Sequence, residues 1–411
     1  MSVENDACVK EKRVNKSSFH STSFKKRPPR LPKVPLPSDT VIRPPSGHPN
    51  ASTTDYYIRD YLGSGAFSSV YAAIRKVNKI KDWVAVKIVP IQDTDNKVAK
   101  FTVENEVEAL MKAGHHPSIV CLLDYFHDKQ YAYLILELCE CKSLSLLMRE
   151  KQSTNKRYCS EHRTRTYMKS ILEALQYLHS LNIMHRDIKL NNVFVIDNYS
   201  QVKIADFGMS VVLKDAQDLQ TYQCGTPSYV APEIVFPEIV KNQGYGLEID
   251  IFSAGICMFN LLTGKLPFTV DRADLEIKRD QALVELELAK MQAKKIINNE
   301  FQPIEKKQQQ QQEQEEEGEG EEEKQALCIK ELEEKYQNAN QLCHQTDIEI
   351  VYQKLFKCDI TFPPSDEIPI SSRAKQVCLG MLQKDPKRRW TIHHILNHSF
   401  FTGCSSSNIE K

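Results

Sequence analysis

A glycine-containing segment, Leu62-Gly63-Ser64-Gly65-Ala66-Phe67-Ser68-Ser69-Val70, lies between two strand-like runs. Glycines let a backbone turn tightly and bring its N–H groups close to phosphate oxygens. No helix-like run follows the glycines. This argues against a dinucleotide-binding or Walker-type loop, because both need a helix at that point. Taken alone, the segment fits an ordinary hairpin turn equally well.

A lysine stands within a β-branched run, Val84-Ala85-Val86-Lys87-Ile88-Val89. An unpaired lysine is costly to bury. Lys87 therefore either lies on the exposed face of an edge strand or binds nucleotide phosphates while a carboxylate holds it. The helix predicted at 101–113 offers Glu104, Glu106 and Glu108.

Two further motifs supply acids in a fixed order. His185-Arg186-Asp187-Ile188-Lys189-Leu190-Asn191-Asn192 is followed 14 residues later by Asp206-Phe207-Gly208. Together with the glycine segment and the lysine strand, this set resembles the eukaryotic Ser/Thr protein kinases. The resemblance runs from Tyr57 to about Phe401, interrupted by residues 272–346. Lys189 lies two residues after Asp187, and a lysine at this position resembles the Ser/Thr kinases rather than the tyrosine kinases.

The resemblance implies an α+β, bilobal protein kinase fold with a β-rich N-lobe and a mainly helical C-lobe. It implies transfer of the γ-phosphoryl group of ATP to Ser and Thr hydroxyls of protein substrates, with ATP and Mg²⁺ as cofactors. Asp187 would orient the substrate hydroxyl, and Asn192 and Asp206 would hold Mg²⁺, which prefers oxygen ligands. Lys87 would bind the α- and β-phosphates and Lys189 the γ-phosphate.

The resemblance also implies supporting residues. Glu106 would pair with Lys87, because it lies eleven residues before Pro117. Glu233 of Ala231-Pro232-Glu233 would form a buried ion pair with Arg389, and Asp250 would support the catalytic loop. The implied ATP-binding residues are Leu62, Gly63, Ser64, Gly65, Ala66, Phe67, Ser68, Ser69, Val70, Ala85, Lys87, Leu136, Glu137, Cys139 and Phe194.

The segment after the Asp-Phe-Gly motif narrows the resemblance. Cys224-Gly225-Thr226-Pro227-Ser228-Tyr229 closely resembles polo-like and Aurora kinases, and the polo-like catalytic domain is the best overall likeness. We expect no polo-box region after it. A phosphate on this segment could pair with Arg186. Thr221 is the candidate phosphosite, although the family's position falls on Tyr222.

Composition and sequence pattern divide the chain into six predicted parts. Residues 1–55 form a basic, Pro-rich arm of net charge +5 that we expect to be disordered, with a loose SH3-ligand or nuclear-import pattern at Lys26–Pro32. The remaining parts are the N-lobe and hinge (56–139), the C-lobe in two pieces (140–271 and 347–404), a charged Gln/Glu-rich insert (272–346) and a tail (405–411).

The insert has two open interpretations. Its acidic tract, residues 305–325, carries a net charge of −6, and helical patterns flank it at 275–299 and 324–338. It is either a tolerated low-complexity insertion or a helical module for a partner or for self-association.

Composition excludes other classes. The 54 basic and 54 acidic residues cancel, which excludes binding of nucleic acid through bulk charge. No membrane span or secretory signal is apparent, and the 12 Cys do not form a dense framework, so we expect a cytoplasmic or nuclear location. The main rivals are a pseudokinase scaffold and a small-molecule kinase.

Overall fold

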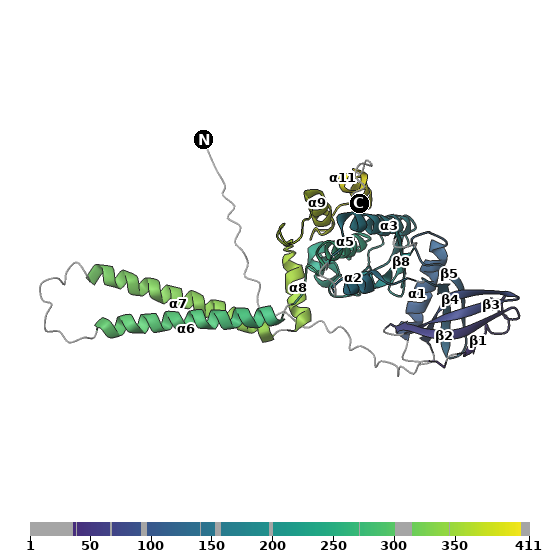
Figure 1. Cartoon of the computed structure of the whole chain (residues 1–411), viewed down its shortest axis with the longest axis horizontal. Coiled ribbons are helices and arrows are strands. Elements are labelled where there is room, and N and C mark those ends of the chain that lie inside the picture. Colours follow the sequence, from purple (N-terminus) through teal and green to yellow (C-terminus); the bar gives the residue numbers. More distant parts are fainter. Residues whose placement is uncertain are drawn as a thin grey trace. The chain divides into compact units, whose positions relative to one another are not determined.

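The computed structural model describes residues 36–403, except for 38, 66–67, 92–96, 140, 153–157, 197–199, 271, 301–314 and 345. The chain divides into two compact units. Figure 1 labels the helices and strands of the chain. The N-terminal unit comprises the described residues of Met1–Ala99 and Asp124–Leu136. The C-terminal unit comprises those of Lys100–Leu123 and Glu137–Lys411. The predicted α+β class is confirmed.

The N-terminal unit is a six-stranded sheet in the order β1-β2-β3-β4-β6-β5. β1 to β4 pair antiparallel in sequence order. Alternating side chains on one face, among them Tyr56, Ile58, Val84 and Val86, form its buried core. The strands are β1 (Val41–Ile42), β2 (Thr54–Ser64), β3 (Ser69–Val77), β4 (Ile80–Pro90), β5 (Leu122–His127) and β6 (Tyr131–Glu137).

Residues 39–55, which were predicted to belong to a disordered arm, are ordered in the structure. Val41 and Ile42 add β1 to the edge of the sheet, opposite Tyr57 and Tyr56. Further along, the loop before β2 is tied to Asp124, because Asn50 Nδ2 donates to its carboxylate at 3.0 Å. Residues 39–55 are therefore part of the ordered N-terminal unit, although the arm was predicted to run to residue 55; its prolines are most frequent up to Pro37, and Pro44, Pro45 and Pro49 follow β1.

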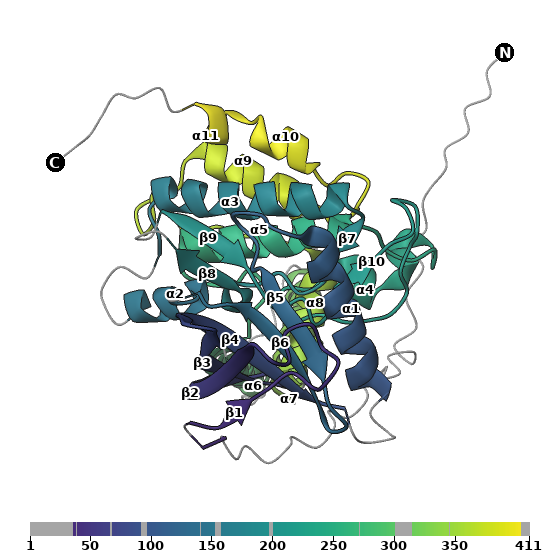
Figure 2. The same cartoon turned by 90° about the vertical axis from the view of Figure 1, so that its right-hand side faces the viewer.

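The C-terminal unit is built around α5 (Glu248–Thr263), a helix that is buried on nearly all sides. A helix with apolar residues all round belongs in the centre of a domain. α3 (Glu161–Ser180) and α9 (Ser372–Met381) pack against it, and α10 (Ile392–Leu396) and α11 (Ser399–Thr402) lie against α3 (Figure 2). Ser160 caps α3 and Ser371 caps α9, each accepting a backbone N–H three residues on.

The remaining elements of this unit are short except in the insert. They are α1 (Lys97–Ala113), α2 (Leu144–Gln152), β7 (Ile183–Met184), η1 (Leu190–Asn192), β8 (Val193–Ile196), β9 (Gln201–Ile204), β10 (Val211–Val212), α4 (Pro232–Val235), η3 (Pro237–Val240), α6 (Arg272–Glu300), α7 (Glu315–His344) and α8 (Asp347–Lys357). α1 groups mainly with this unit, so the units do not divide at the predicted lobe boundary.

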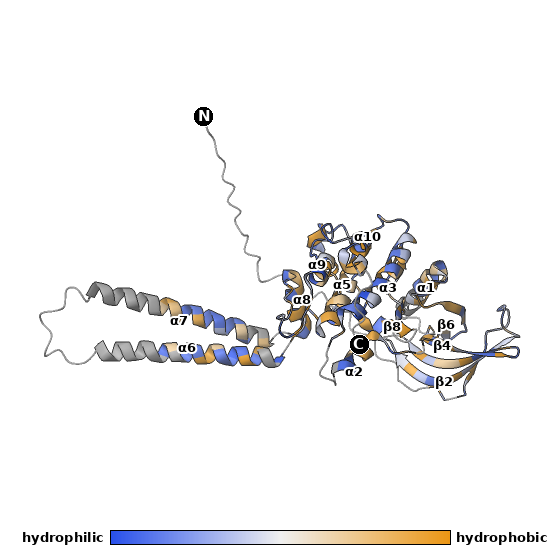
Figure 3. Ribbon diagram, turned by 45° about the horizontal axis from the view of Figure 1, so that its top comes forward, coloured by the Kyte–Doolittle hydropathy of each residue, from blue (hydrophilic) through white to orange (hydrophobic). Residues whose placement is uncertain are grey.

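The insert forms two helices, α6 and α7, that pack along each other. Ala282 and Leu286 of α6 are buried, and Lys290 pairs with Glu333 of α7 at 2.9 Å. Polar and apolar residues alternate along the described parts of both helices (Figure 3). Both helices extend beyond the predicted 275–299 and 324–338. The earlier start of α7, at Glu315, lies in the acidic tract, whose glutamates are good helix formers.

The first prediction concerns Gly380 of α9. A Cβ at this position would lie 2.3 Å from Trp390 Cδ2, and the Trp390 ring is itself stacked on His394 at 4.3 Å. Overpacking typically costs about 1–3 kcal/mol, which exceeds the gain in helix propensity. We expect Gly380→Ala to lower the free energy of unfolding in urea, whereas the neighbouring Leu379→Ala should have a smaller effect. A Gly380→Ala variant as stable as the wild type would contradict this packing.

Candidate active site

The loop that carries His185, Arg186 and Asp187 is held by Asp250, a fully buried residue of α5. The two carboxylate oxygens of Asp250 accept the backbone N–H groups of His185 and Arg186, each at 2.9 Å. His179 Nε2 lies 3.1 Å from the same carboxylate. Burial raises the pKa of Asp250, but the bonds to His179 and His185 outweigh it and hold that pKa below its ordinary value. The predicted support by Asp250 is confirmed.

Asp187 lies at the centre of a small polar network. Lys189 Nζ donates to Asp187 Oδ2 at 2.6 Å, and Thr226 Oγ1 donates to Asp187 Oδ1 at 2.7 Å. Lys189 Nζ also reaches Thr226 Oγ1 at 3.0 Å. Both carboxylate oxygens are thereby oriented, and one of them lies against a cation, which suits a group that accepts or directs a proton.

Sequence reasoning did not assign a site role to Thr226. It appeared only as part of the Cys224–Tyr229 segment, which is separated from Asp187 by 37 or more residues. The structure brings its hydroxyl to both Asp187 and Lys189. The sequence does show that Lys189 has more than one N–H donor and that a hydroxyl lies in the Cys224–Tyr229 segment. No spacing rule, however, connects Lys189 with Thr226.

Asn192 is bonded to this network, and Asp206 follows a residue that is bonded to Asn192. Asn192 Nδ2 donates to the backbone oxygen of Asp187 at 3.0 Å and to its carboxylate at 3.1 Å. Ala205 N donates to the backbone oxygen of Asn192 at 2.8 Å, which fixes the residue before Asp206. Asp206 is exposed and has a left-handed φ of 62°. An amide oxygen and an exposed carboxylate are donors that fit Mg²⁺.

The N-terminal unit contains the glycine segment and the lysine strand. Gly63 pairs with Val70 and Ser64 with Ser69, and Gly65 N donates to Ser68 O at 2.9 Å. The segment is therefore a hairpin turn between β2 and β3. Ala66 and Phe67, which were predicted to bind ATP, lie outside the described residues.

Lys87 lies on β4, between β3 and β6, and is only 7% exposed. The reading of an exposed lysine on an edge strand is therefore excluded. On α1, in the C-terminal unit, Glu106 is 1% exposed, whereas Glu104 and Glu108 are exposed. Only Glu106 of the three is a buried carboxylate, which needs compensating partners.

The residues expected to surround adenine fall in both units. Leu62 is 52% exposed on β2, whereas Ala85 and Leu136 are buried on β4 and β6. Phe194 lies on β8. Burial raises the pKa of the Cys139 thiol to about 11, so this cysteine remains protonated near neutral pH. These placements leave the adenine contacts themselves as predictions.

Glu137 forms an ion pair that the sequence did not suggest. Lys203 Nζ of β9 lies 2.7 Å from the Glu137 carboxylate, which also accepts Cys121 N at 3.3 Å. Lys203 is 8% exposed, whereas the Glu137 side chain is 34% exposed, so only the lysine end of the pair is shielded from water. β9 leads directly to Asp206, and the pair therefore fixes the start of that segment.

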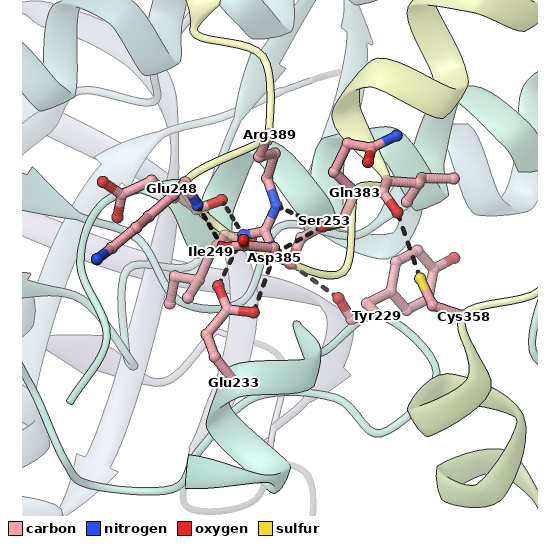
Figure 4. Close-up of polar contacts among 11 residues, drawn as sticks. Tyr229, Glu233, Glu248, Ile249, Ser253, Cys358, Gln383, Asp385 and Arg389 are labelled. Atoms are coloured by element: carbon pink, nitrogen blue, oxygen red, sulfur yellow. Dashed lines mark hydrogen bonds and ion pairs between the residues drawn. The ribbon is translucent and has the colours of Figure 1, made fainter. Parts of the chain in front are cut away.

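The predicted pair of Glu233 and Arg389 is confirmed (Figure 4). The two side chains join through Nη1–Oε1 and Nη2–Oε2 bonds of 2.7 and 2.9 Å. The guanidinium also donates to Glu248 O and to Gln383 O. All five of its N–H groups therefore have an acceptor, which offsets part of the desolvation cost of burying the guanidinium.

Comparison with known proteins decides the family. The sequence matches the protein kinase domain over residues 56–401, most of the chain. The chain belongs to the protein kinase family.

The kinase domain has named relatives at about one third identity. The probable cell cycle serine/threonine-protein kinase CDC5 homolog of Encephalitozoon cuniculi is 34% identical over 216 residues, which are 52% of this chain and 43% of that protein. The serine/threonine-protein kinase PLK4 of Xenopus tropicalis is 36% identical over 217 residues, 53% of this chain and 22% of that protein. This chain therefore spans less than half of these relatives, and the predicted likeness to the polo-like catalytic domain is confirmed.

The buried ion pair generates a stability prediction. Glu233→Gln leaves the Arg389 charge buried without its counter-ion, which typically costs about 3–5 kcal/mol. We expect urea unfolding to report a loss of this size, and a smaller loss when Glu233→Leu is combined with Arg389→Met. The control is Arg388→Met, because Arg388 is largely exposed and lies 3.9 Å from Asp385. Equal losses for Arg388 and Glu233 variants would contradict the assignment.

One buried histidine, His185, and two partly buried ones, His116 and His398, generate a pH prediction. Burial lowers the pKa values of His185, His116 and His398 from their ordinary value of 6.5. Below about pH 6.5 the unfolded chain then binds more protons than the folded chain, so stability is lost as the pH falls. We expect the free energy of unfolding to decrease between pH 7 and pH 5, by up to about 1.4 kcal/mol per pH unit for His185 alone. A flat or rising profile in urea unfolding would be the contrary result.

Proposed function

We propose that this chain is a Ser/Thr protein kinase that transfers the γ-phosphoryl group of ATP to hydroxyl groups of protein substrates. The observation that carries the proposal is the network of Asp187, Lys189 and Thr226, in which a carboxylate is oriented by a cation and a hydroxyl. The family membership and the named relatives support the same reaction.

The roles follow from the chemistry of each group. Asp187 orients the attacking hydroxyl and receives its proton, and Lys189 offsets charge that develops on the transferred phosphoryl group. Asn192 and Asp206 would hold Mg²⁺, which supplies charge neutralisation at the phosphate oxygens when it is bound. Lys87 binds the α- and β-phosphates, in the pairing with Glu106 that the family resemblance implies.

Other parts of the proposal rest on the sequence. The residues expected to receive adenine are those predicted around Ala85, Leu136 and Phe194. Thr221, which is exposed, is the candidate site of phosphorylation on the segment after Asp206. A cytoplasmic or nuclear location and polo-like cell-cycle work belong to the same proposal. Among the described residues, no helix is both long and apolar enough to cross a membrane.

The insert is proposed as an interaction module for a partner or for self-association. Ile277 and Val284 of α6 are 56% and 58% exposed. They lie seven residues apart, so they share one helical face, which is opposite to the face of buried Leu286. Two helices joined by Lys290–Glu333 and Lys335–Glu285 pairs form a defined surface rather than an unstructured loop.

The activity prediction uses the 411-residue chain with labelled ATP, Mg²⁺ and a generic protein substrate. We expect Asp187→Asn and Asp206→Ala each to reduce phosphate transfer by at least about 100-fold, because proton direction and metal binding are each lost. Asp366→Ala, at an exposed carboxylate outside the site, should retain full activity.

The same experiment has a contrary outcome. Equal labelling by the wild type, Asp187→Asn and Asp206→Ala would sink the catalytic assignment. Nucleotide binding without transfer in the wild type would instead favour a pseudokinase scaffold. Mapping of the labelled residues would show whether Ser and Thr receive phosphate and whether Thr221 is among the sites.

A further inference from the structure

The segment that leads to Thr226 is clamped by a short loop before α5. Gln220 and Tyr245 form a reciprocal antiparallel bridge, with both N–H···O bonds at 2.9 Å. The Tyr245 hydroxyl donates to the backbone oxygen of Tyr222, and Cys224 Sγ lies 3.9 Å from the same hydroxyl. Gln220, Tyr222 and Cys224 are thus all held by Tyr245, which is 3% exposed.

The residue before Tyr245 allows this close approach. Gly244 has a left-handed φ of 97°, and a Cβ there would lie 2.8 Å from Gln220 O. Any other residue would strain the backbone and push the two segments apart. The bridge therefore depends on glycine at 244 as well as on tyrosine at 245.

The clamped segment runs directly to the acid of the site. Gly225, with a φ of 107°, follows Cys224, and a Cβ on it would meet Arg186 O at 3.1 Å. The next residue is Thr226, whose hydroxyl donates to Asp187 at 2.7 Å. Only three residues separate Thr226 from Tyr222, so a shift at Tyr222 moves Thr226 Oγ1 out of its short hydrogen bond.

The contacts need no added phosphate. The Arg186 guanidinium donates to the backbone oxygens of Met209 and Ser210, at 2.5 and 3.3 Å. Burial raises the pKa of the Tyr245 hydroxyl, so the group keeps its proton and remains a donor at neutral pH. The segment is thus held by hydrogen bonds from side chains and backbone groups of the protein itself.

We infer that Tyr245 is a positioning residue, which acts through residues 222–226 to hold the Thr226 hydroxyl against Asp187 and Lys189. The inference rests on the proposed kinase function for its catalytic consequence, but not for the clamp itself.

The test compares two tyrosines that make the same kind of bond. Tyr245→Phe removes the hydroxyl that binds Tyr222 O, whereas Tyr177→Phe removes one that donates to Ala113 O at 2.8 Å, away from the Asp187 network. Loss of one neutral hydrogen bond that acts on the site should lower kcat/KM for a protein substrate about three- to tenfold. The KM for ATP should stay unchanged, and Tyr177→Phe should retain wild-type kcat/KM.

Coupling separates positioning from mere stability. In a Thr226→Ala background, Tyr245→Phe should lower kcat/KM by less than about twofold, because the hydroxyl that it positions is already absent. Full additivity, or an equal fall in kcat/KM for Tyr177→Phe, would overturn the inference.

Amide hydrogen exchange tests the clamp without activity. Tyr245→Phe should accelerate exchange across residues 220–226, and Tyr177→Phe should not. Unchanged exchange in Tyr245→Phe would overturn the inference. An inactive wild type, together with accelerated exchange in Tyr245→Phe, would instead refute the proposed kinase function and leave the clamp supported.

Discussion

The catalytic loop depends on one buried carboxylate. Asp250 accepts two consecutive backbone N–H groups, from His185 and Arg186. Arg186 adopts a left-handed φ of 65°, which a residue with a side chain rarely occupies without compensation. The two bonds supply that compensation, because they are charge-assisted and shielded from water. Without them, the loop would relax and Asp187 would leave its partners.

Helix α5 extends this constraint to both sides of the site. Asp250 holds the loop, Ser253 Oγ donates to Tyr229 O at 2.8 Å, and Glu248 O accepts from Arg389. One helix therefore fixes the catalytic loop, the segment after Thr226 and the Glu233–Arg389 pair. Because α5 is packed on nearly all sides, these three anchors cannot move independently.

Much of the fold and of the candidate active site was predictable from motifs that occur in a fixed order along the sequence. The lysine strand, the His-Arg-Asp loop and the Asp-Phe-Gly segment carry their roles in local sequence, and helices such as α3 and α5 follow from apolar periodicity. The roles of Thr226 and Tyr245 were not predictable, because each is defined by contacts with residues about 20 to 40 positions away. The Lys203–Glu137 pair was missed for the same reason, since it joins residues that are 66 apart.

The order of the residues before β2 could not be predicted for a different reason. Residues 39–55 have a loop-like composition, yet Tyr56 Oη and Asn50 both bind the Asp124 carboxylate. Composition reports the average tendency of a segment to bury apolar surface, whereas a single buried anion can order a polar loop. One acceptor that lies 74 residues away from Asn50 cannot be read from local composition.

The base of the insert is closed by polar contacts. Arg272 pairs with Asp347 at 2.7 Å and donates to Cys343 O, while Lys354 Nζ donates to Thr269 O. The two points where the insert leaves and rejoins the domain are therefore held together whatever lies between them. Loop length adds little closure cost once the ends are fixed. The insert could therefore be replaced by helices of other lengths or sequences at this position, and the rest of the kinase domain would keep its connectivity.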